Sequence, residues 1–449
     1  MAQACLLCLK RGQSCLPKVY KSTINKEGSA LLTTAPRGTK DVMPADVNAW
    51  RYLEATMRKI CAQYGYKEIR TPVFEHTELF QRGIGDTTDV VEKEMYTFTD
   101  RGNRSITLRP ENTASAVRAY VEHKLSKEDA AAKFFYMGPM FRYDRPQAGR
   151  LREFHQFGVE ALGVFGPNVD AEIILLAVQV LQALGLKDLK LKINSVGCPN
   201  CRPQHREKLQ AFFKPHFDEL CKDCQGRFDR NPLRLLDCKN PHCQELGVGA
   251  PSLEECLCDE CKAHFEGVKE LLTAAGVDYE VDHNLVRGLD YYTKTAFEIQ
   301  YAPLGAQSAV CGGGRYDGLV QEISGDEARP GIGFAMGMER VLLALEKQNL
   351  LPEFDESIDA YVVCPKKENF TLAFKTAIDL RRAGFKVEYD FNGRSMKAQM
   401  KQANKFQAKK VLIFGEDEVA RGNVTVRNMA TSEQQEIAIN DITKFFNTL

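Results

Sequence analysis

Nine cysteines between residues 195 and 277 constrain the fold of this chain more than any other feature. The chain has 449 residues and 15 cysteines, so these nine are clustered, and they are mixed with prolines and short helical pieces. Disulfide frameworks belong to short secreted chains, which favours metal binding or reduced thiols here. Strand-like sequence stands on both sides of the stretch. We therefore expect a cysteine-rich domain inserted into a mostly antiparallel sheet.

Eight of the nine cysteines form pairs with the spacing of zinc ligands, and Cys256 is left over. Spacing alone favours one or two four-cysteine Zn²⁺ sites, but the sequence does not decide whether the pairs bind zinc. Cys61, Cys311 and Cys364 lie elsewhere and are interpreted as small buried hydrophobic residues. The pairs are Cys198 with Cys201, Cys221 with Cys224, Cys238 with Cys243, and Cys258 with Cys261.

Charge and hydropathy exclude several classes of protein. Sixty basic and sixty acidic residues cancel, so any nucleic-acid binding must use local patches. The most apolar run, residues 171–186, is interrupted by Glu172, Gln179 and Gln182. No uncharged run reaches the roughly 18 residues of a membrane span. We expect a cytoplasmic protein without a membrane segment.

The pattern of strands and helices divides the chain into five segments. Residues 1–34 carry five basic residues and one acidic residue, and they are a transit segment, an upstream extension or a mis-set start. Residues 35–194 and 278–352 predict the two parts of an α+β core, an antiparallel sheet with flanking helices, around the insertion at 195–277. Strands and helices alternate over 358–449, which predicts a small α/β domain of βαβ units.

Residues 141–154 form the densest candidate site. Four arginines fall within eleven positions between two predicted strands. The planar guanidinium group binds phosphate oxygens through paired hydrogen bonds, which favours an anion-binding loop over a solvated hairpin tip. The four arginines are Arg142, Arg145, Arg150 and Arg152.

Two glycine-rich stretches and one turn complete the candidates. Residues 311–318 contain three consecutive glycines, which let the backbone approach a ligand closely. Residues 330–340 predict a strand leading into a helix that starts near Met338, with Arg340 in its first turn. A cation there opposes the helix dipole, so we expect Arg340 to face an anion. Residues 285–293 place an arginine and two tyrosines in either a pocket or a structural turn. Neither glycine-rich stretch is a P-loop or a Rossmann fingerprint.

Together these segments resemble a known family. A strand ending at Pro72, the strand–loop–strand at 140–158 and the strand–helix at 330–340 resemble motifs 1, 2 and 3 of class II aminoacyl-tRNA synthetases. Residues 287–292 (Arg-Gly-Leu-Asp-Tyr-Tyr) and 312–319 (Gly-Gly-Gly-Arg-Tyr-Asp-Gly-Leu) resemble the two signatures specific to histidyl-tRNA synthetases, here of the bacterial type.

The resemblance implies a ligase with a two-step reaction. L-Histidine and ATP give histidyl-adenylate and pyrophosphate, and histidine then moves to the 3′ end of histidine tRNA. It implies that Arg142 and Arg287 are catalytic cations at the α-phosphate and that Arg340 holds the far end of ATP, so Arg142 and Arg340 bind ATP. Preorganised cations should carry most of the catalysis, because charge develops on the α-phosphate. Mg²⁺ is expected on the outer phosphates.

The resemblance also implies a histidine pocket. Glu111 and Thr113 match positions that bind the ammonium group, and Gln156 matches another substrate contact. Glu160 and Tyr292 match the residues that read the imidazole ring, whose two nitrogens need two polar partners. The complete implied set is Glu111, Asn112, Thr113, Arg142, Gln156, Glu160, Arg287, Tyr291 and Tyr292.

For tRNA, the resemblance implies contacts in two places. The last domain would read the anticodon, and between Arg394 and Lys410 it carries six basic residues and no acid, four of them lysines spaced by four. Such a stripe is either a phosphate-binding surface or a solvated helix face. Motif 1 around Pro72 implies a homodimer. The acceptor end would meet Arg145, Gln147, Arg150 and Arg152.

Three alternatives remain. The first is a catalytically silent paralogue that regulates the phosphoribosyltransferase of histidine biosynthesis, which lacks the C-terminal domain and departs from the signature at 287–292. The second is a related synthetase for proline, threonine or glycine. The third is a nucleic-acid-binding zinc protein with an inactive core, which the presence of Arg142, Arg287 and Arg340 disfavours.

Overall fold

The structure is a computed structural model. It describes residues 34–448 except 86–87, 128–130, 239 and 326–327. The predicted N-terminal extension therefore lies outside the described residues, apart from Thr34. The chain divides into two compact units, Met1–Leu351 and Pro352–Leu449.

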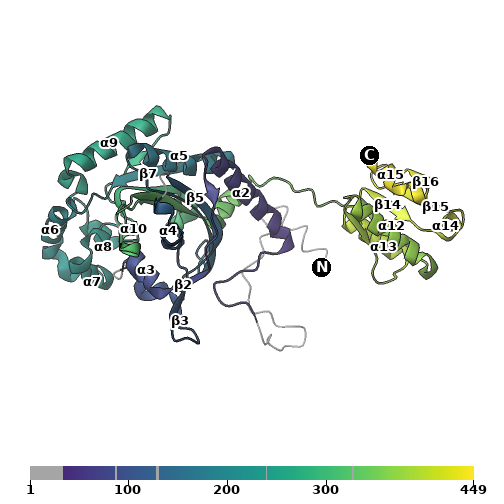
Figure 1. Cartoon of the computed structure of the whole chain (residues 1–449), viewed down its shortest axis with the longest axis horizontal. Helices are drawn as coiled ribbons and strands as arrows, with labels where there is room; N and C mark the ends of the chain where they lie inside the picture. Colours follow the sequence, from purple (N-terminus) through teal and green to yellow (C-terminus); the bar gives the residue numbers. More distant parts are fainter. Residues whose placement is uncertain (1–33, 86–87, 128–130, 239, 326–327, 449) are drawn as a thin grey trace, which may run out of the picture. The chain divides into compact units, whose positions relative to one another are not determined.

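An eight-stranded sheet forms the centre of the first unit, in the order β1-β5-β6-β11-β10-β9-β7-β8 (Figure 1). Only the two edge pairs, β1 with β5 and β7 with β8, are parallel, so the predicted antiparallel sheet is confirmed. The strands are β1 Lys67–Glu68, β5 Ala132–Phe141, β6 Glu153–Leu162, β7 Leu189–Ser195, β8 Glu280–Val281, β9 Thr293–Tyr301, β10 Ala309–Arg315 and β11 Gly331–Gly337.

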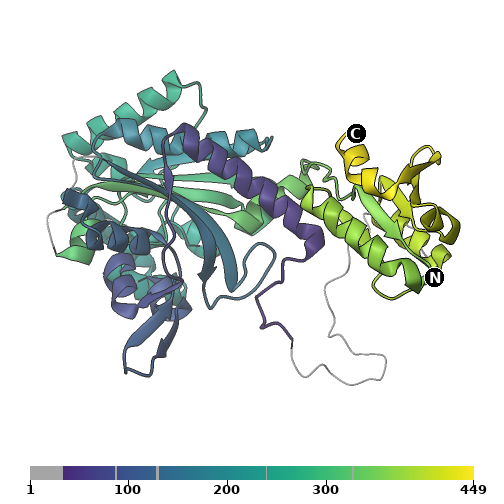
Figure 2. The same cartoon turned by 45° about the vertical axis from the view of Figure 1, so that its right-hand side comes forward.

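One face of this sheet is the hydrophobic core. Side chains alternate along a strand, so Phe157 and Val159 of β6 enter the core while Gln156 and Glu160 lie on the opposite face. Helix α2 runs alongside the sheet in Figure 2. The helices that contribute to this core are α2 Pro44–Gln63, α5 Pro167–Ala183, α9 Asp259–Ala274 and α11 Met338–Lys347, the last beginning where the sequence predicts.

The opposite face carries shorter elements. Helix α4 contributes Val117 and Tyr120, and α10 contributes Leu319 and Val320, to a second cluster of buried residues. A small sheet in the order β2-β4-β3 adjoins them, and its hairpin of β3 and β4 projects away from the large sheet (Figure 2). These elements are α3 Thr77–Ile84, α4 Thr113–Glu122, α10 Leu319–Ser324, β2 Phe74–His76, β3 Tyr96–Thr99, β4 Ser105–Leu108 and the π-helix η1 Val90–Glu94.

The cysteine-rich insertion lies between β7 and β8, where the chain leaves the sheet and returns to it (Figure 1). Besides α9, its helices are α6 Arg202–Phe213, α7 Lys222–Arg230 and α8 Pro241–Leu246. Three of the seven fully buried residues in its own cluster are cysteines. The seven are Leu209, Phe213, Leu220, Cys224, Leu235, Cys238 and Cys243.

The second unit contains a five-stranded sheet in the order β13-β12-β14-β15-β16. Strands β12, β13 and β14 are parallel, as βαβ units require, whereas β15 and β16 add an antiparallel hairpin that the sequence analysis did not predict. The elements are β12 Ala360–Val363, α12 Phe370–Arg382, β13 Val387–Tyr389, α13 Met396–Lys405, β14 Lys410–Ile413, α14 Glu416–Ala420, β15 Asn423–Asn428, β16 Gln434–Ala438 and α15 Ile442–Asn447.

Two expectations about apolar residues can be compared with this fold. Among the described residues, no helix combines the length and apolar character that crossing a membrane would need. Cys61 and Cys311 are fully buried, as predicted. The prediction for Cys364 is wrong, because this residue is only partly buried and its thiol donates to the carbonyl of Lys366 (3.1 Å).

Candidate active site

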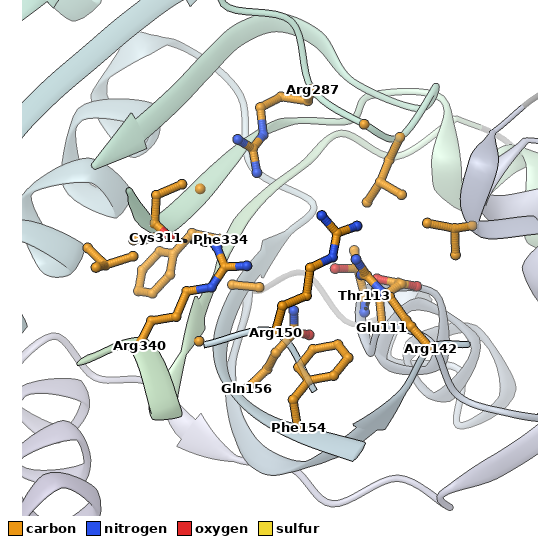
Figure 3. A pocket seen from close by; sticks show the side chains of 18 of the residues that line it. Glu111, Thr113, Arg142, Arg150, Phe154, Gln156, Arg287, Cys311, Phe334 and Arg340 are labelled. Atoms are coloured by element: carbon orange, nitrogen blue, oxygen red, sulfur yellow. Dashed lines mark hydrogen bonds between the residues drawn. The ribbon is translucent and has the colours of Figure 1, made fainter. Parts of the chain in front are cut away.

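A cavity of about 300 Å³ opens on the polar face of the large sheet (Figure 3). Strands β6, β10 and β11 form its floor, and its walls come from Val90 of η1, the start of α4, the loop between β5 and β6, and the turn that precedes β9. The floor is made largely of small residues, including Gly312, Gly333 and Gly337. Four candidate segments that lie far apart in the chain, residues 141–154, 285–293, 311–318 and 330–340, therefore meet at one place.

Four arginines line this cavity, and Figure 3 shows their guanidinium groups directed toward the space between them. Arg287 approaches from one side, and Arg340, Arg150 and Arg142 approach from the other. Like charges gathered in one partly buried place repel one another unless an anion joins them. The arrangement therefore suits a polyanionic ligand such as a nucleoside triphosphate.

Arg287 is held in place by a carboxylate and a glycine. Its Nη1 donates to Glu298 of β9 at 2.5 Å, and a Cβ at position 312 would collide with its guanidinium group. Burial alone would lower the pKa of Arg287, but Glu298 beside it raises the pKa, so the cation stays charged. Its buried Nε makes no hydrogen bond within the described part of the chain. A ligand oxygen can take that position.

Arg340 stands in the first turn of α11, as predicted. Its Nε donates to the carbonyl of Gly149 (2.9 Å) and its Nη1 to the carbonyl of Ala309 (2.8 Å). Burial lowers the pKa of Arg340, and the nearby Arg150 and Arg142 lower it further. Negative charge in the cavity would relieve this repulsion, which agrees with the expectation that Arg340 faces an anion.

Of the four arginines in the segment between β5 and β6, Arg142 and Arg150 line the cavity. Arg142 donates from Nε to the carbonyl of Pro110 (2.8 Å), with its guanidinium 5.4 Å from the centre of the Phe154 ring. Arg150 also lines the cavity and forms an ion pair with Asp144.

The other loop residues predicted to meet tRNA lie outside the cavity. Arg145 and Gln147 are exposed at the tip of the loop, where backbone hydrogen bonds of 3.0 Å join Gln147 and Arg150. Arg152 stacks on the Tyr143 ring at 3.9 Å and donates to the carbonyl of Asp144 (3.1 Å). Arg152 therefore supports the loop from within.

Glu111, Thr113 and Gln156 all line the cavity. The carboxylate of Glu111 accepts the backbone N–H groups of Thr113 (2.7 Å) and Ala114 (2.9 Å) at the start of α4, and burial raises its pKa. The buried Oε1 of Gln156 has no hydrogen-bond partner among the described residues. An acceptor left open in this way suits a donor on a ligand.

Glu160 lies just beneath the floor and does not itself line the cavity. Its side chain is 1% exposed and accepts hydrogen bonds from the hydroxyls of Thr113 (2.8 Å), Tyr136 (3.0 Å) and Tyr316. Burial raises the pKa of Glu160 to about 8, although these hydrogen bonds act in the opposite direction. Thr113 and Tyr316 connect this buried carboxyl group to the cavity wall.

Tyr291 and Tyr292 line the cavity with ring centres 4.6 Å apart. Asn112 does not line it, because its side chain points into the structure and accepts from Thr71 Oγ1 (2.6 Å) and Arg109 Nη1 (3.0 Å). Of the implied histidine-binding residues, Asn112 and Glu160 are thus the two that stand behind the wall.

Sequence reasoning gave no role to three residues that shape this site, Glu298, Tyr136 and Tyr316, although Tyr316 lies within the signature at 312–319. For Glu298 a signal was available, because this acid alternates with apolar residues along a strand and so must face away from the core. Tyr136 gave no such signal, since its importance depends on Gly158 opposite it in the β5–β6 pair, where a Cβ would collide with the Tyr136 ring.

The predicted basic stripe of the second unit is smaller than expected. Arg394 pairs with Asp390 and Lys409 with Asp359, so acids from elsewhere in the fold neutralise part of it. The exposed lysines left on α13 are Lys397, Lys401 and Lys405.

The paired cysteines of the insertion converge in two groups of four, each of which could hold a metal ion. Cys256 belongs to neither group. The first group is Cys198, Cys201, Cys258 and Cys261, and the second is Cys221, Cys224, Cys238 and Cys243.

An antiparallel sheet with arginines on one face, contributed by a strand–loop–strand and a strand–helix, defines a class II aminoacyl-tRNA synthetase fold. Residues 38–200 and 248–341 match the family model described as histidyl-tRNA synthetase, and residues 359–449 match an anticodon binding domain. The chain belongs to the histidyl-tRNA synthetase family.

Relatives and solved structures agree with this assignment. The histidine–tRNA ligase of Desulforamulus reducens is 56% identical over 415 residues, which cover 92% of this chain and 99% of that protein. That of Moorella thermoacetica is 56% identical over 409 residues, covering 91% and 96%. The crystal structure of apo S. aureus histidyl-tRNA synthetase has a TM-score of 0.78 at 40% identity and covers 92% of this chain and 100% of that chain.

Proposed function

We propose that this chain activates L-histidine with ATP and transfers the histidine to the 3′ end of histidine tRNA. The observation that carries the proposal is the convergence of four arginines and the histidyl-specific signatures on one cavity of a class II synthetase fold. In the transition state of the first step, negative charge is redistributed over the oxygens around the attacked α-phosphorus and onto the departing pyrophosphate, so fixed cations there accelerate the step.

In the first step, Arg287 and Arg142 hold the α-phosphate, and Arg340 holds the far end of ATP. Arg287 suits this role because Glu298 fixes its orientation and its Nε is open to a ligand oxygen. Mg²⁺ bound to the outer phosphates of ATP would neutralise part of their charge, since this ion is held mostly by phosphate oxygens, water and one or two carboxylates. Pyrophosphate leaves, and the carboxylate of histidine becomes bonded to the α-phosphorus.

Histidine occupies the side of the cavity near α4. Glu111 and Thr113 bind its ammonium group, with Gln156 as a further contact. Tyr292 beside Tyr291 reads the imidazole directly, and Glu160 acts from behind the wall through Thr113 and Tyr316. Because these polar groups would be left unpaired by an apolar amino acid, the site rejects such competitors by about 10⁴-fold or more.

The remaining parts complete the same reaction. Residues 35–194 and 278–352 form the catalytic core, 195–277 the insertion, and 358–449 the unit that reads the anticodon. Arg145, Gln147, Arg150 and Arg152 contact the acceptor end, and Lys397, Lys401 and Lys405 bind tRNA phosphates. The enzyme works as a cytoplasmic homodimer. Structural Zn²⁺ in the insertion belongs to the same proposal, since thiolates are preferred zinc ligands.

Amino-acid-dependent ATP–pyrophosphate exchange, measured with all twenty amino acids without and then with tRNA, tests the proposal. Exchange with histidine alone is expected. Exchange with a different amino acid would indicate a related synthetase. Exchange with none would contradict the proposal and favour the regulatory paralogue, and the next step would be a search for a phosphoribosyltransferase partner.

A further inference from the structure

The first cysteine group has the geometry of a tetrahedral metal site. Cys198 Sγ lies 3.6 Å from Cys201 Sγ and 3.9 Å from Cys258 Sγ, although Cys258 is 60 residues further along the chain. A zinc ion with Zn–S bonds of about 2.3 Å holds its four sulfurs about 3.8 Å apart. The backbone N–H of Cys258 donates to Cys201 Sγ (3.2 Å), a contact that stabilises a metal-bound thiolate.

The second group repeats this geometry within a shorter stretch. Cys221 Sγ lies 3.9 Å from Cys238 Sγ, and the backbone N–H of Cys221 donates to Cys243 Sγ (3.3 Å). Cys238 Sγ accepts the N–H of Asn240 (3.4 Å). A cluster of several irons would hold the sulfurs further apart, so both groups fit a single ion. The family match omits residues 201–247, which include the whole second group.

The region around the second group has little else to hold it together. Its cluster has seven fully buried residues, and three of these are the cysteines Cys224, Cys238 and Cys243. A hydrophobic core of that size does not offset the loss of chain entropy, and natural domains of this kind use a metal or disulfides instead. All twelve described cysteines are free of disulfides. A metal ion bound by the four thiols of the second group would close this region.

The four cysteines of the second group close residues 225–237 into a loop of the chain, which consists of the end of α7 and a short 3-10 helix at Pro232–Leu235 and docks on the catalytic core. Three of its polar side chains reach acidic residues of the core, and Arg234 and Arg230 also line a cavity of about 410 Å³ that adjoins Arg287 and Tyr292. The contacts are Arg227 to Asp89 (2.5 Å), Arg230 to Glu92 (2.5 Å) and Asn231 to Asp290 (2.7 Å).

All three acids lie close in sequence to residues that line the active-site cavity, at a separation of one or two positions. Asp89 and Glu92 flank Val90 in η1, and Asp290 precedes Tyr291. The first group has a similar link, because Arg202 follows Cys201 and donates to the carbonyl of Tyr292. The cysteine groups thus lie at the base of the segments that support two walls of the active site.

We infer that the insertion binds two zinc ions, one in each cysteine group, and that the second ion holds the loop 225–237 against the active-site wall at η1 and Asp290. This inference rests on the structural zinc of the proposed function, and it adds the number of ions, their ligands and the role of the second ion. Arg227, Arg230 and Asn231 are positioning residues, since they act on the cavity only through the acids that they contact.

Metal analysis of the purified full chain and three variants tests the two sites. The wild type and Cys256→Ser, which alters the unpaired ninth cysteine, are expected to hold two zinc ions per chain. Cys198→Ser/Cys258→Ser and Cys221→Ser/Cys238→Ser are each expected to hold one. The assignment would be overturned by less than about 0.2 zinc per wild-type chain or by iron in place of zinc. It would also be overturned if Cys256→Ser lost as much zinc as the two double variants.

Hydrogen exchange tests the task of the second ion. In Arg227→Gln/Arg230→Gln, which retains all eight cysteines, two zinc ions should remain while the amides of residues 88–94 lose protection at least about tenfold. Unchanged protection there would overturn the docking role. If Cys221→Ser/Cys238→Ser does not fold, zinc can be released from the wild type with a mercurial reagent instead. The amides of residues 88–94 should then lose protection as the zinc is released. Histidine-dependent pyrophosphate exchange on the same samples reports separately on the proposed function.

Discussion

The central sheet and the cysteine-rich insertion belong to one compact unit but bury very different amounts of apolar side chain. The core behind the sheet contains 37 buried residues, most of them from four helices and six strands, whereas the cluster around the second cysteine group of the insertion contains seven. A sheet with one well-packed face can carry repelling arginines on its other face, because the packed face supplies the stability. The region around the second cysteine group has no such reserve, and we infer that its loop, residues 225–237, depends on those cysteines.

Removing Arg287 should give the largest effect and should affect chemistry alone. Arg287→Ala is expected to slow adenylate formation by roughly 10²–10³, since one fixed cation at the developing charge is lost. The melting temperature should stay close to that of the wild type, because the packed face of the sheet is untouched. Pyrophosphate exchange and thermal unfolding measure the two quantities.

Arg104→Ala, which alters an exposed arginine of the β3–β4 hairpin, is the matched control. It should leave exchange unchanged. If Arg287→Ala stayed within about tenfold of the wild type, the catalytic cation would be wrongly assigned.

Adding one methyl group to the floor should have the next largest effect. In Gly312→Ala the new Cβ displaces the guanidinium of Arg287, and a misplacement of about 1 Å can cost about 10²-fold in rate. Gly318→Ala serves as the control from the same signature, since its φ is −90° and a Cβ there meets nothing closer than 3.7 Å. Equal kcat values for the two variants would mean that the floor does not position Arg287.

The buried carboxyl group of Glu160 should make the free energy of unfolding depend on pH, which the apolar core behind the sheet does not. Burial raises the pKa of Glu160 to about 8, so the folded state keeps a proton that the unfolded state loses near pH 4.5. Stability from this group is therefore complete at acidic pH and falls as pH rises toward 8, by at most about 1.4 kcal/mol per pH unit.

Urea unfolding of the wild type and Glu160→Gln between pH 5 and pH 8 measures this. Glu160→Gln should lack the decline, so the difference between the two proteins should grow in favour of the variant. Parallel curves would show that Glu160 is ionised throughout this range.

A single ion pair of the docked loop should have the smallest effect. Arg230 is half exposed in its pair with Glu92, so Arg230→Gln should lower the free energy of unfolding by less than about 1 kcal/mol. Urea unfolding checks it. A loss of several kcal/mol would mean that side-chain contacts, rather than the cysteine groups, hold the insertion, and the contrast with the sheet would be lost.

The sequence predicted the sheet and the four arginines well, because each belongs to a motif with local meaning. Helix α11 begins at Met338, as the strand–helix pattern predicts. The pattern could not reveal that Asn112 turns inward or that Asp359 neutralises Lys409, since both depend on partners distant in the sequence. The grouping of the cysteine pairs was undecidable for the same reason: spacing identifies pairs, and only the fold decides which pairs meet.

The glycine floor of the active-site cavity has a consequence for inhibition. At Gly312 an added Cβ would displace the guanidinium of Arg287, and at Gly333 it would collide with Glu160 and with the backbone carbonyl of Val159, so a substitution at either position disturbs the site. An adenylate-like inhibitor that draws its affinity from backbone groups of this floor would meet few routes to resistance. Substitutions that weaken it would have to arise on the arginine-bearing walls, where they would also slow the enzyme.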